Sequence, residues 1–281
     1  MPTFDAVAID VLFAMLKGEP GTRKSTQALS FPKPQYWVST DQKMEALAIP
    51  MKRWGINNKD VTFDDYSDWD SPCAKLKTFQ VNCPYRTIVV DSATSIGDNI
   101  NRQTKRNKAA SDKGKVIGGI STNSIEDYNA EASAFQDLMA ILKDIHKFHK
   151  VNIVLIAHVV GQRSNNDGNK LTHHSRVIIT GGDKISGKIA SYMTEVYHFN
   201  VETDFNVDSG DGKFGLFTSH TGNDFARTAL PLERKILFND EPLYDRWLLP
   251  AINKLKAEKP IQGIPAQTVQ NQTSTASGFT K

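Results

Sequence analysis

Gly18-Glu19-Pro20-Gly21-Thr22-Arg23-Lys24-Ser25 directly follows the apolar run Val11 to Leu16. Glycines in such a stretch let successive backbone N–H groups curl around phosphate oxygens at the start of a helix. A lysine there reaches the β- and γ-phosphates of a nucleotide, and the hydroxyl after it binds Mg²⁺. The order of strand, loop, Lys-Ser and helix therefore predicts a P-loop, whose nucleotide-binding residues are Gly18, Gly21, Thr22, Arg23, Lys24, Ser25 and Thr26.

One position departs from the usual P-loop pattern G-x-x-x-x-G-K-[ST]. Arg23 stands where the second glycine is expected, so its side chain must either point away from the nucleotide or contact it. We expect the Lys24 side chain to be exposed before a nucleotide binds. The alternative interpretation is a Gly/Pro turn between a strand and a short helix that Pro32 ends.

A second chemical feature is the apolar run Thr87 to Val90, which ends in the carboxylate Asp91. An aspartate at the carboxyl end of a strand can hold Mg²⁺ opposite the P-loop hydroxyl. Alone this signal is weak, because many strands end in aspartate. Downstream of a P-loop it predicts that Ser25 and Asp91 together organise Mg²⁺.

The rest of the chain alternates short apolar runs with polar, helix-like stretches. A helix is predicted from about residue 125 to 150, where apolar residues recur at spacings of three and four. Near-continuous apolar runs are typical of parallel strands, which helices cover on both faces. We therefore expect an α/β fold with a mostly parallel sheet flanked by helices, built on the strands Val11–Leu16, Tyr36–Val38, Thr87–Val90, Ile153–Ala157 and Tyr197–Val201.

With these motifs in place, the chain resembles the RecA-like P-loop ATPases. The stretch Ile88-Val89-Val90-Asp91-Ser92 is similar to that family's Walker B strand. The resemblance implies ATP and Mg²⁺ as cofactors, a catalytic role for Lys24, and a water-activating carboxylate at the end of another strand. That place is taken by Asp41, although the family residue is normally glutamate. It also implies that His158 senses the γ-phosphate; the alternative is a hydrogen-bonded histidine at a strand end.

Two long polar segments, Gly97–Gly119 and Gly161–Gly182, interrupt the alternation. We expect both to be loops, since loops of this length in a compact domain are usually functional. They lie where RecA-like proteins place DNA-binding loops. The alternative is a solvated insertion. The resemblance assigns DNA binding to Arg102, Lys105, Arg106, Lys108, Lys113, Lys115, Arg163, Lys170 and Arg176.

More narrowly, the chain resembles phage-encoded RecA-like ATPases with single-strand annealing or recombination roles. This resemblance implies single-stranded DNA and a single-strand-binding protein as partners, a homo-oligomer, and the cytoplasm of a bacterial host. Two rival functions stay open. One is a nucleotide-gated protein-interaction module with little or no hydrolysis, for which Arg23 and Asp41 are signs of lost catalysis. The other is a P-loop kinase for a small phosphate acceptor.

Composition limits the remaining possibilities. The chain has 281 residues, of which 39% are hydrophobic, so it can bury a substantial core. A net charge of +3 is too small to predict a polyanionic partner by itself. Two cysteines support no disulfide framework, and no apolar run approaches the length of about 18 residues that a membrane span needs. We expect one ATPase domain over residues 1–257 and a flexible polar tail over 258–281.

Overall fold

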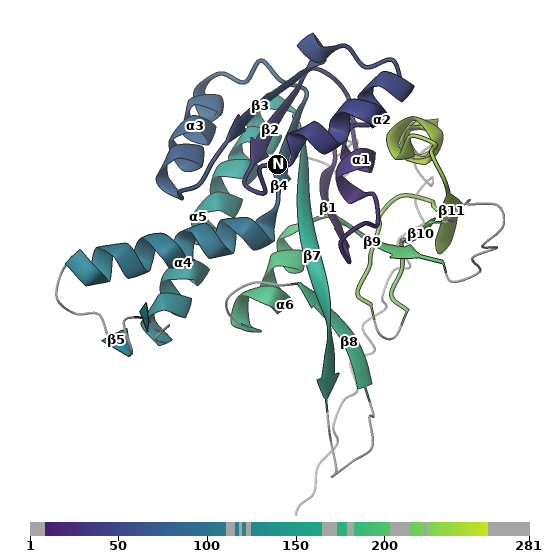
Figure 1. Cartoon of the computed structure of the whole chain (residues 1–281). Coiled ribbons are helices and arrows are strands. Elements are labelled where there is room, and N and C mark those ends of the chain that lie inside the picture. The colour runs from purple at the N-terminus through teal and green to yellow at the C-terminus, as the bar shows by residue number, and fades with distance from the viewer. Residues whose placement is uncertain are drawn as a thin grey trace, which may run out of the picture.

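The computed structural model describes residues 9–110, 116–117, 120–121, 125–164, 173–178, 183–202, 214–221 and 224–257, without the side chains of 108–128 and 160–187. In these residues a central sheet is flanked by helices on both faces (Figure 1). The predicted tail lies outside the described residues, so it and the domain boundary stay predictions. None of the described helices is long and apolar enough to cross a membrane.

The described strands form a nine-stranded sheet in the order β11-β10-β9-β1-β7-β4-β2-β3, with β8 paired to β7. The six strands from β9 to β3 in this order run parallel, whereas β10, β11 and β8 pair antiparallel. This is the predicted RecA-like α/β fold, with a mostly parallel sheet. The strands are β1 (Phe13–Gly18), β2 (Gln35–Ser39), β3 (Val61–Asp65), β4 (Thr87–Asp91), β7 (Asn152–Ser164), β8 (His173–Ile178), β9 (Glu195–Val201), β10 (Phe214–Phe217) and β11 (Lys235–Phe238).

Helices cover both faces of the sheet because consecutive side chains of each parallel strand are buried on opposite sides. Along β1, Met15 belongs to one buried cluster, and its neighbours Ala14 and Leu16 belong to the other. The first cluster includes side chains of α3, α4, α5 and α6, and the second includes those of α1 and α7. The helices are α1 (Lys24–Ala28), α2 (Ala48–Arg53), α3 (Asp70–Val81), α4 (Ala93–Ala110), α5 (Ile125–His149), α6 (Asp183–Tyr192) and α7 (Leu249–Ala257).

All five predicted strands and the long helix α5 are confirmed, with boundaries shifted by one or two residues at most ends. The strands β3, β10 and β11 were not predicted. Each is only four or five residues long, and β3 lies at the edge of the sheet with Phe63 exposed. Short edge strands lack the continuous apolar run that central strands need, so their sequence signal is weak.

Where the structure describes them, the two segments predicted as long loops form regular secondary structure instead. Most of the segment 97–119 belongs to helix α4, and a short hairpin of β5 (Val116–Ile117) and β6 (Ile120–Ser121) follows it. Ile96 and Ile100, one helical turn apart, are buried in the core, so α4 is an amphipathic helix whose other faces are polar. The segment 161–182 contains the hairpin of β7 and β8, which extends beyond the rest of the sheet (Figure 1).

Candidate active site

The P-loop connects the end of β1 to the start of α1 at the carboxyl edge of the parallel sheet. Gly18 lies so close to β9 that a Cβ atom on it would be 2.4 Å from the Phe199 carbonyl oxygen. Gly21 has a φ of 81°, which glycine adopts without strain. The Thr22 hydroxyl donates a hydrogen bond of 2.8 Å to the Glu19 carbonyl and closes the loop. Local geometry therefore requires both glycines.

Arg23 adopts the left-handed backbone conformation, with a φ of 64°, at the position where the usual motif has glycine. Its side chain points out of the loop. The Nη1 atom donates a hydrogen bond of 2.7 Å to the Asn239 carbonyl and forms an ion pair with Asp240. The guanidinium also lies 4.4 Å from the centre of the Phe214 ring. Of the two alternatives that the sequence left open, the structure has the side chain pointing away from the loop.

Residues 239–244, which we call the clamp segment, hold the P-loop and α1 from outside. Asp240 forms a second ion pair with Arg53 at 2.5 Å, and its carbonyl accepts a hydrogen bond of 2.9 Å from the Trp54 indole. The Gln27 side chain of α1 donates to the Glu241 carbonyl at 3.0 Å and accepts from the Leu243 N–H at 2.7 Å. The left-handed Arg23 is thus held by several contacts to one segment.

The Lys24 side chain is buried, with 4% of the residue exposed, and the expectation that it is exposed was wrong. Its Nζ donates hydrogen bonds to the carbonyls of Gly18 at 2.9 Å and Glu19 at 2.8 Å. Burial lowers the pKa of Lys24 to about 8, although the charges of Asp91, Asp41 and Glu19 oppose this shift. The carbonyls of the P-loop itself therefore hold the Lys24 ammonium inside the loop.

Ser25 and Asp91, the predicted Mg²⁺ pair, lie in contact. Asp91 ends β4, and its carboxylate accepts a hydrogen bond from the Ser25 side chain. Burial raises the pKa of Asp91 to about 6, and the Ser25 hydrogen bond opposes that rise. Hydroxyl and carboxylate oxygens are ligands that Mg²⁺ prefers, so the pair fits the ion. Thr26, the last predicted P-loop residue, is half-buried on α1.

Asp41 and His158 lie together although 117 residues separate them. The His158 Nε2 is 3.3 Å from the Asp41 carboxylate, which also accepts hydrogen bonds from Ser95 and, at 2.9 Å, from Ser92. Burial alone would raise the pKa of Asp41, but the hydrogen bonds of His158, Ser95 and Ser92 outweigh it and lower the pKa to about 2. Asp41 is therefore a stable carboxylate that can orient a water molecule.

His158 does not end its strand, which corrects the prediction. The strand β7 continues to Ser164, but its parallel pairing with β1 stops at the register pair Gly18 and His158. The His158 backbone N–H donates to the Thr94 hydroxyl of α4 at 3.2 Å. His158 thus marks the point where β7 leaves the sheet and enters the hairpin with β8.

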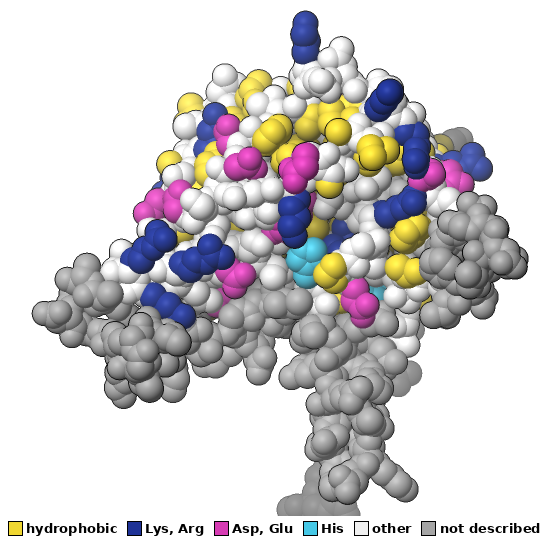
Figure 2. All heavy atoms as spheres, in the orientation of Figure 1, with side chains coloured by type: hydrophobic (Ala, Val, Ile, Leu, Met, Phe, Trp, Pro, Cys, Tyr) yellow, Lys and Arg dark blue, Asp and Glu magenta, His cyan; other side chains and the backbone are white. Residues whose placement is uncertain are grey.

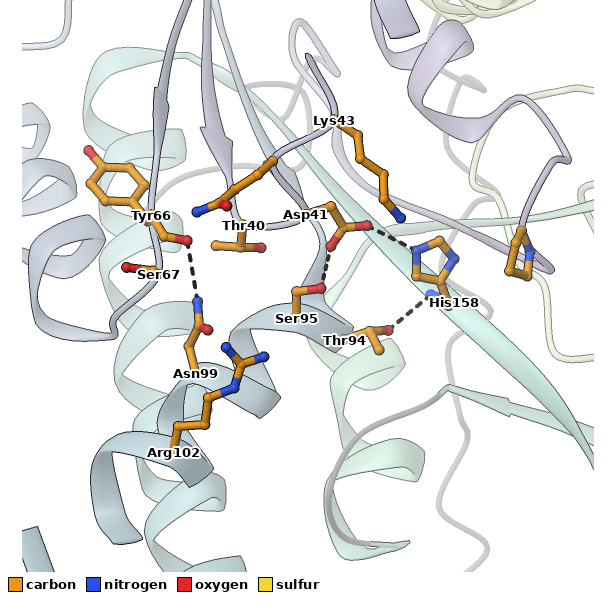
Figure 3. Close-up of a pocket in the computed structure, with 12 residues that line it drawn as sticks. Thr40, Asp41, Lys43, Tyr66, Ser67, Thr94, Ser95, Asn99, Arg102 and His158 are labelled. Atoms are coloured by element: carbon orange, nitrogen blue, oxygen red, sulfur yellow. Dashed lines mark hydrogen bonds and ion pairs between the residues drawn. The ribbon is translucent and has the colours of Figure 1, made fainter. Parts of the chain in front are cut away.

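A pocket of about 510 Å³ opens beside the P-loop residue Pro20 and the Asp41–His158 pair (Figure 3). Sequence reasoning missed most of its residues, because no motif marks them. The exceptions are Asp41 and His158, which were predicted as catalytic residues, and Arg102, which was predicted to bind DNA. The lining residues are Pro20, Thr40, Asp41, Gln42, Lys43, Tyr66, Ser67, Thr94, Ser95, Asn99, Arg102 and His158.

The predicted DNA-binding residues divide into those the structure describes and those it does not. Arg102, Lys105 and Arg106 lie on α4, over which basic side chains gather in Figure 2. Arg163 and Arg176 lie in the β7–β8 hairpin, where only the backbone is described, and the same holds for Lys108 in α4. The other three lie outside the described residues: Lys113, Lys115 and Lys170.

Comparison with known proteins identifies the family of this chain. Residues 12–230 match a family described as an AAA domain. The chain belongs to this AAA domain family. Among solved structures, the AAA domain is similar to a KaiC-like protein from the hyperthermophilic archaeon Pyrococcus horikoshii OT3, with 13% identity, coverage of 82% of this chain and 86% of the other, and a TM-score of 0.48. No curated protein matches it in sequence. The AAA domain is therefore a P-loop, nucleotide-binding ATPase in its fold.

Proposed function

We propose that this AAA domain binds Mg-ATP, hydrolyses it, and couples its nucleotide state to single-stranded DNA binding in phage-type recombination or strand annealing. The observation that carries the proposal is the attachment of two basic elements to the candidate active site. Helix α4 begins two residues after Asp91, and the hairpin part of β7 begins directly after His158. Annealing would further involve a homo-oligomer and a single-strand-binding protein.

Phosphate binding would use the P-loop described above. Backbone N–H groups from Gly21 to Ser25 lie at the start of α1, where a helix favours negative charge. Lys24 would exchange the Gly18 and Glu19 carbonyls for phosphate oxygens. Ser25 and Asp91 would hold Mg²⁺, which when bound would neutralise charge that develops on the phosphates.

Hydrolysis would depend on Asp41, which we assign to orienting the attacking water. A carboxylate with a pKa of about 2 is a weak base at neutral pH, so positioning rather than proton removal is its role. His158 contacts the Asp41 carboxylate directly and would respond to the γ-phosphate.

Coupling to DNA would pass through the first turn of α4. The Thr94 hydroxyl accepts from the His158 backbone, and the Ser95 hydroxyl donates to Asp41. A shift of the Asp41–His158 pair would therefore move α4, whose later turns carry Lys105 and Arg106. Two discrete positions of this helix would link the nucleotide to the basic surface.

The test is binding of single-stranded DNA, by filter retention, with ATP, with ADP and without nucleotide. We expect binding only with ATP, slight sequence preference, and a log–log salt slope of roughly −0.7 per contacted phosphate. The double variant Lys105→Ala/Arg106→Ala should bind more weakly on every sequence and show a shallower slope. A matched control, Lys52→Ala/Lys254→Ala, removes two exposed cations from α2 and α7 and should bind as wild type does.

The rival function, a nucleotide-gated protein-interaction module, gains support from the hydrogen bonds that hold Asp41. A carboxylate held by His158, Ser92 and Ser95 can stabilise a site without catalysis. If the wild-type protein binds no single-stranded DNA with ATP present, the DNA proposal fails and this rival replaces it. Measurable ATP turnover in the same sample would count against the rival.

A further inference from the structure

The pocket beside Asp41 is much larger than hydrolysis requires. A water molecule occupies about 30 Å³, whereas the pocket measures about 510 Å³. Asp41 and His158 lie at one end, and the opposite wall is formed by Tyr66, Ser67, Asn99 and Arg102, from the loop after β3 and from α4 (Figure 3). Pro20 of the P-loop also lines the pocket. The space therefore extends from the candidate nucleotide site toward α4.

Two cations of the pocket have no protein partner. In the part of the chain that the structure describes, neither Lys43 nor Arg102 forms a hydrogen bond or an ion pair. Figure 3 shows the Lys43 ammonium extending toward the Asp41–His158 pair, and the Arg102 guanidinium pointing from α4 into the pocket. Other cations of the chain, such as Arg23 and Lys256, form ion pairs with carboxylates.

The remaining lining is suited to an anion rather than to an apolar molecule. Gln42 and Asn99 contribute side-chain amides, and among the described residues the Asn99 amide makes one long contact, 3.5 Å to the Tyr66 carbonyl. Asp41 is the one carboxylate among the lining residues, and its oxygens already accept hydrogen bonds from His158, Ser92 and Ser95. Its negative charge is thus engaged, while both positive charges are available.

The backbone conformation of Gln42 helps to place Lys43 at the pocket. Gln42, between Asp41 and Lys43, has a φ of 53°, which side-chain-bearing residues rarely adopt. This conformation lets the consecutive residues Asp41, Gln42 and Lys43 all line the pocket, whereas consecutive side chains would alternate between the two faces of the sheet if β2 continued.

We propose that Lys43 and Arg102 form a second phosphate site in the pocket beside Asp41, separate from the P-loop. Its ligand is a phosphate group, which two cations from different elements bind by charge-assisted hydrogen bonds. The group has two candidate sources, inorganic phosphate leaving the nucleotide site or a backbone phosphate of a bound strand. The inference rests on nucleotide binding at the P-loop, but not on DNA binding.

The experiment is isothermal titration calorimetry on protein saturated with the non-hydrolysable analogue AMP-PNP, so that the γ-phosphate position is filled. Inorganic phosphate and a thymidine pentanucleotide are titrated separately. A pentanucleotide with uncharged methylphosphonate linkages is the control for the DNA source. The variants are Lys43→Gln and Arg102→Gln, and the matched control is Lys52→Gln, which removes an exposed cation of α2 outside the pocket.

We expect at least one phosphate-bearing titrant to bind wild type and Lys52→Gln alike, and to bind each pocket variant about tenfold more weakly. Inorganic phosphate binding identifies the released product as the source; binding of only the charged pentanucleotide identifies the strand. No binding of either titrant to wild type, or binding that neither pocket variant weakens, overturns the inference. If AMP-PNP does not bind, the P-loop assignment fails, and the same variant comparison on the nucleotide-free protein decides the second site.

Discussion

Cations lie on two sides of the P-loop, and their surroundings differ. On the clamp side, Arg23 and Arg53 share the Asp240 carboxylate, and Arg23 also stacks on Phe214. On the pocket side, Lys43 and Arg102 line the pocket, and no carboxylate in the described part of the chain pairs with either of them. Arg23 and Arg53 therefore hold the P-loop in shape, whereas Lys43 and Arg102 are available to a ligand. Replacing Lys43 or Arg102 should therefore change ligand binding without changing the free energy of unfolding.

Lys24 lies between these two sides, and its removal should have the largest effect. We expect Lys24→Ala to lose ATP binding by at least about a hundredfold, because a buried ammonium supplies several charge-assisted contacts to phosphate. Calorimetry with ATP measures the loss, and Lys52→Ala on the surface of α2 is the control. Near-wild-type affinity in Lys24→Ala would remove the P-loop assignment. Thermal melting should show that both variants remain folded.

Replacing Asp41 should reduce ATP hydrolysis more than ATP binding. We expect Asp41→Asn to keep ATP affinity and to lose about 10² to 10⁴ in hydrolysis rate, since water positioning is worth that range. Phosphate release under saturating ATP measures it. If turnover persists in this variant, the water-positioning group lies elsewhere, and Glu45 on the following turn is the next residue to replace.

Variants of Arg23 test whether contacts to the clamp segment stabilise the conformation of the P-loop. Arg23→Ala loses the contacts to Asp240 and Phe214 and keeps a strained φ of 64°, so ATP affinity should fall about tenfold. Arg23→Gly loses the same contacts but adopts this φ without strain, so affinity should stay within about threefold of wild type. An equal loss in the two variants would mean that the side-chain contacts, and not the backbone conformation, carry the effect.

The smallest expected effect is a difference in stability between a variant on the clamp side and a variant on the pocket side. Asp240→Asn removes the carboxylate that Arg23 and Arg53 share, and we expect it to cost about 1 kcal/mol or less, because these groups are partly exposed. Arg102→Gln removes an unpaired cation and should leave the melting temperature unchanged. Chemical denaturation of both variants measures the difference. Equal destabilisation would show that Arg102 has a structural role and would weaken the comparison.

Local sequence patterns determined much of this protein. The glycines and Lys24-Ser25 predicted the P-loop, since a phosphate-binding turn needs these residue types at short spacing. Apolar runs predicted the central strands, because parallel strands are buried on both faces. Asp91, Asp41 and His158 were located as strand-associated polar residues, and the common carboxyl edge of a parallel sheet explains why they meet.

The tertiary structure alone decided where the side chains find partners. Arg23 and Asp240 are 217 residues apart, and no local pattern relates them. Lys24 is buried because its own loop supplies carbonyl acceptors at the right distance, which depends on loop geometry rather than on residue type. Helix α4 was taken for a loop because its two buried isoleucines lie among polar residues, and packing against α5 stabilises what local propensity does not indicate. The sequence around Arg102 therefore could not show that this residue lines a pocket.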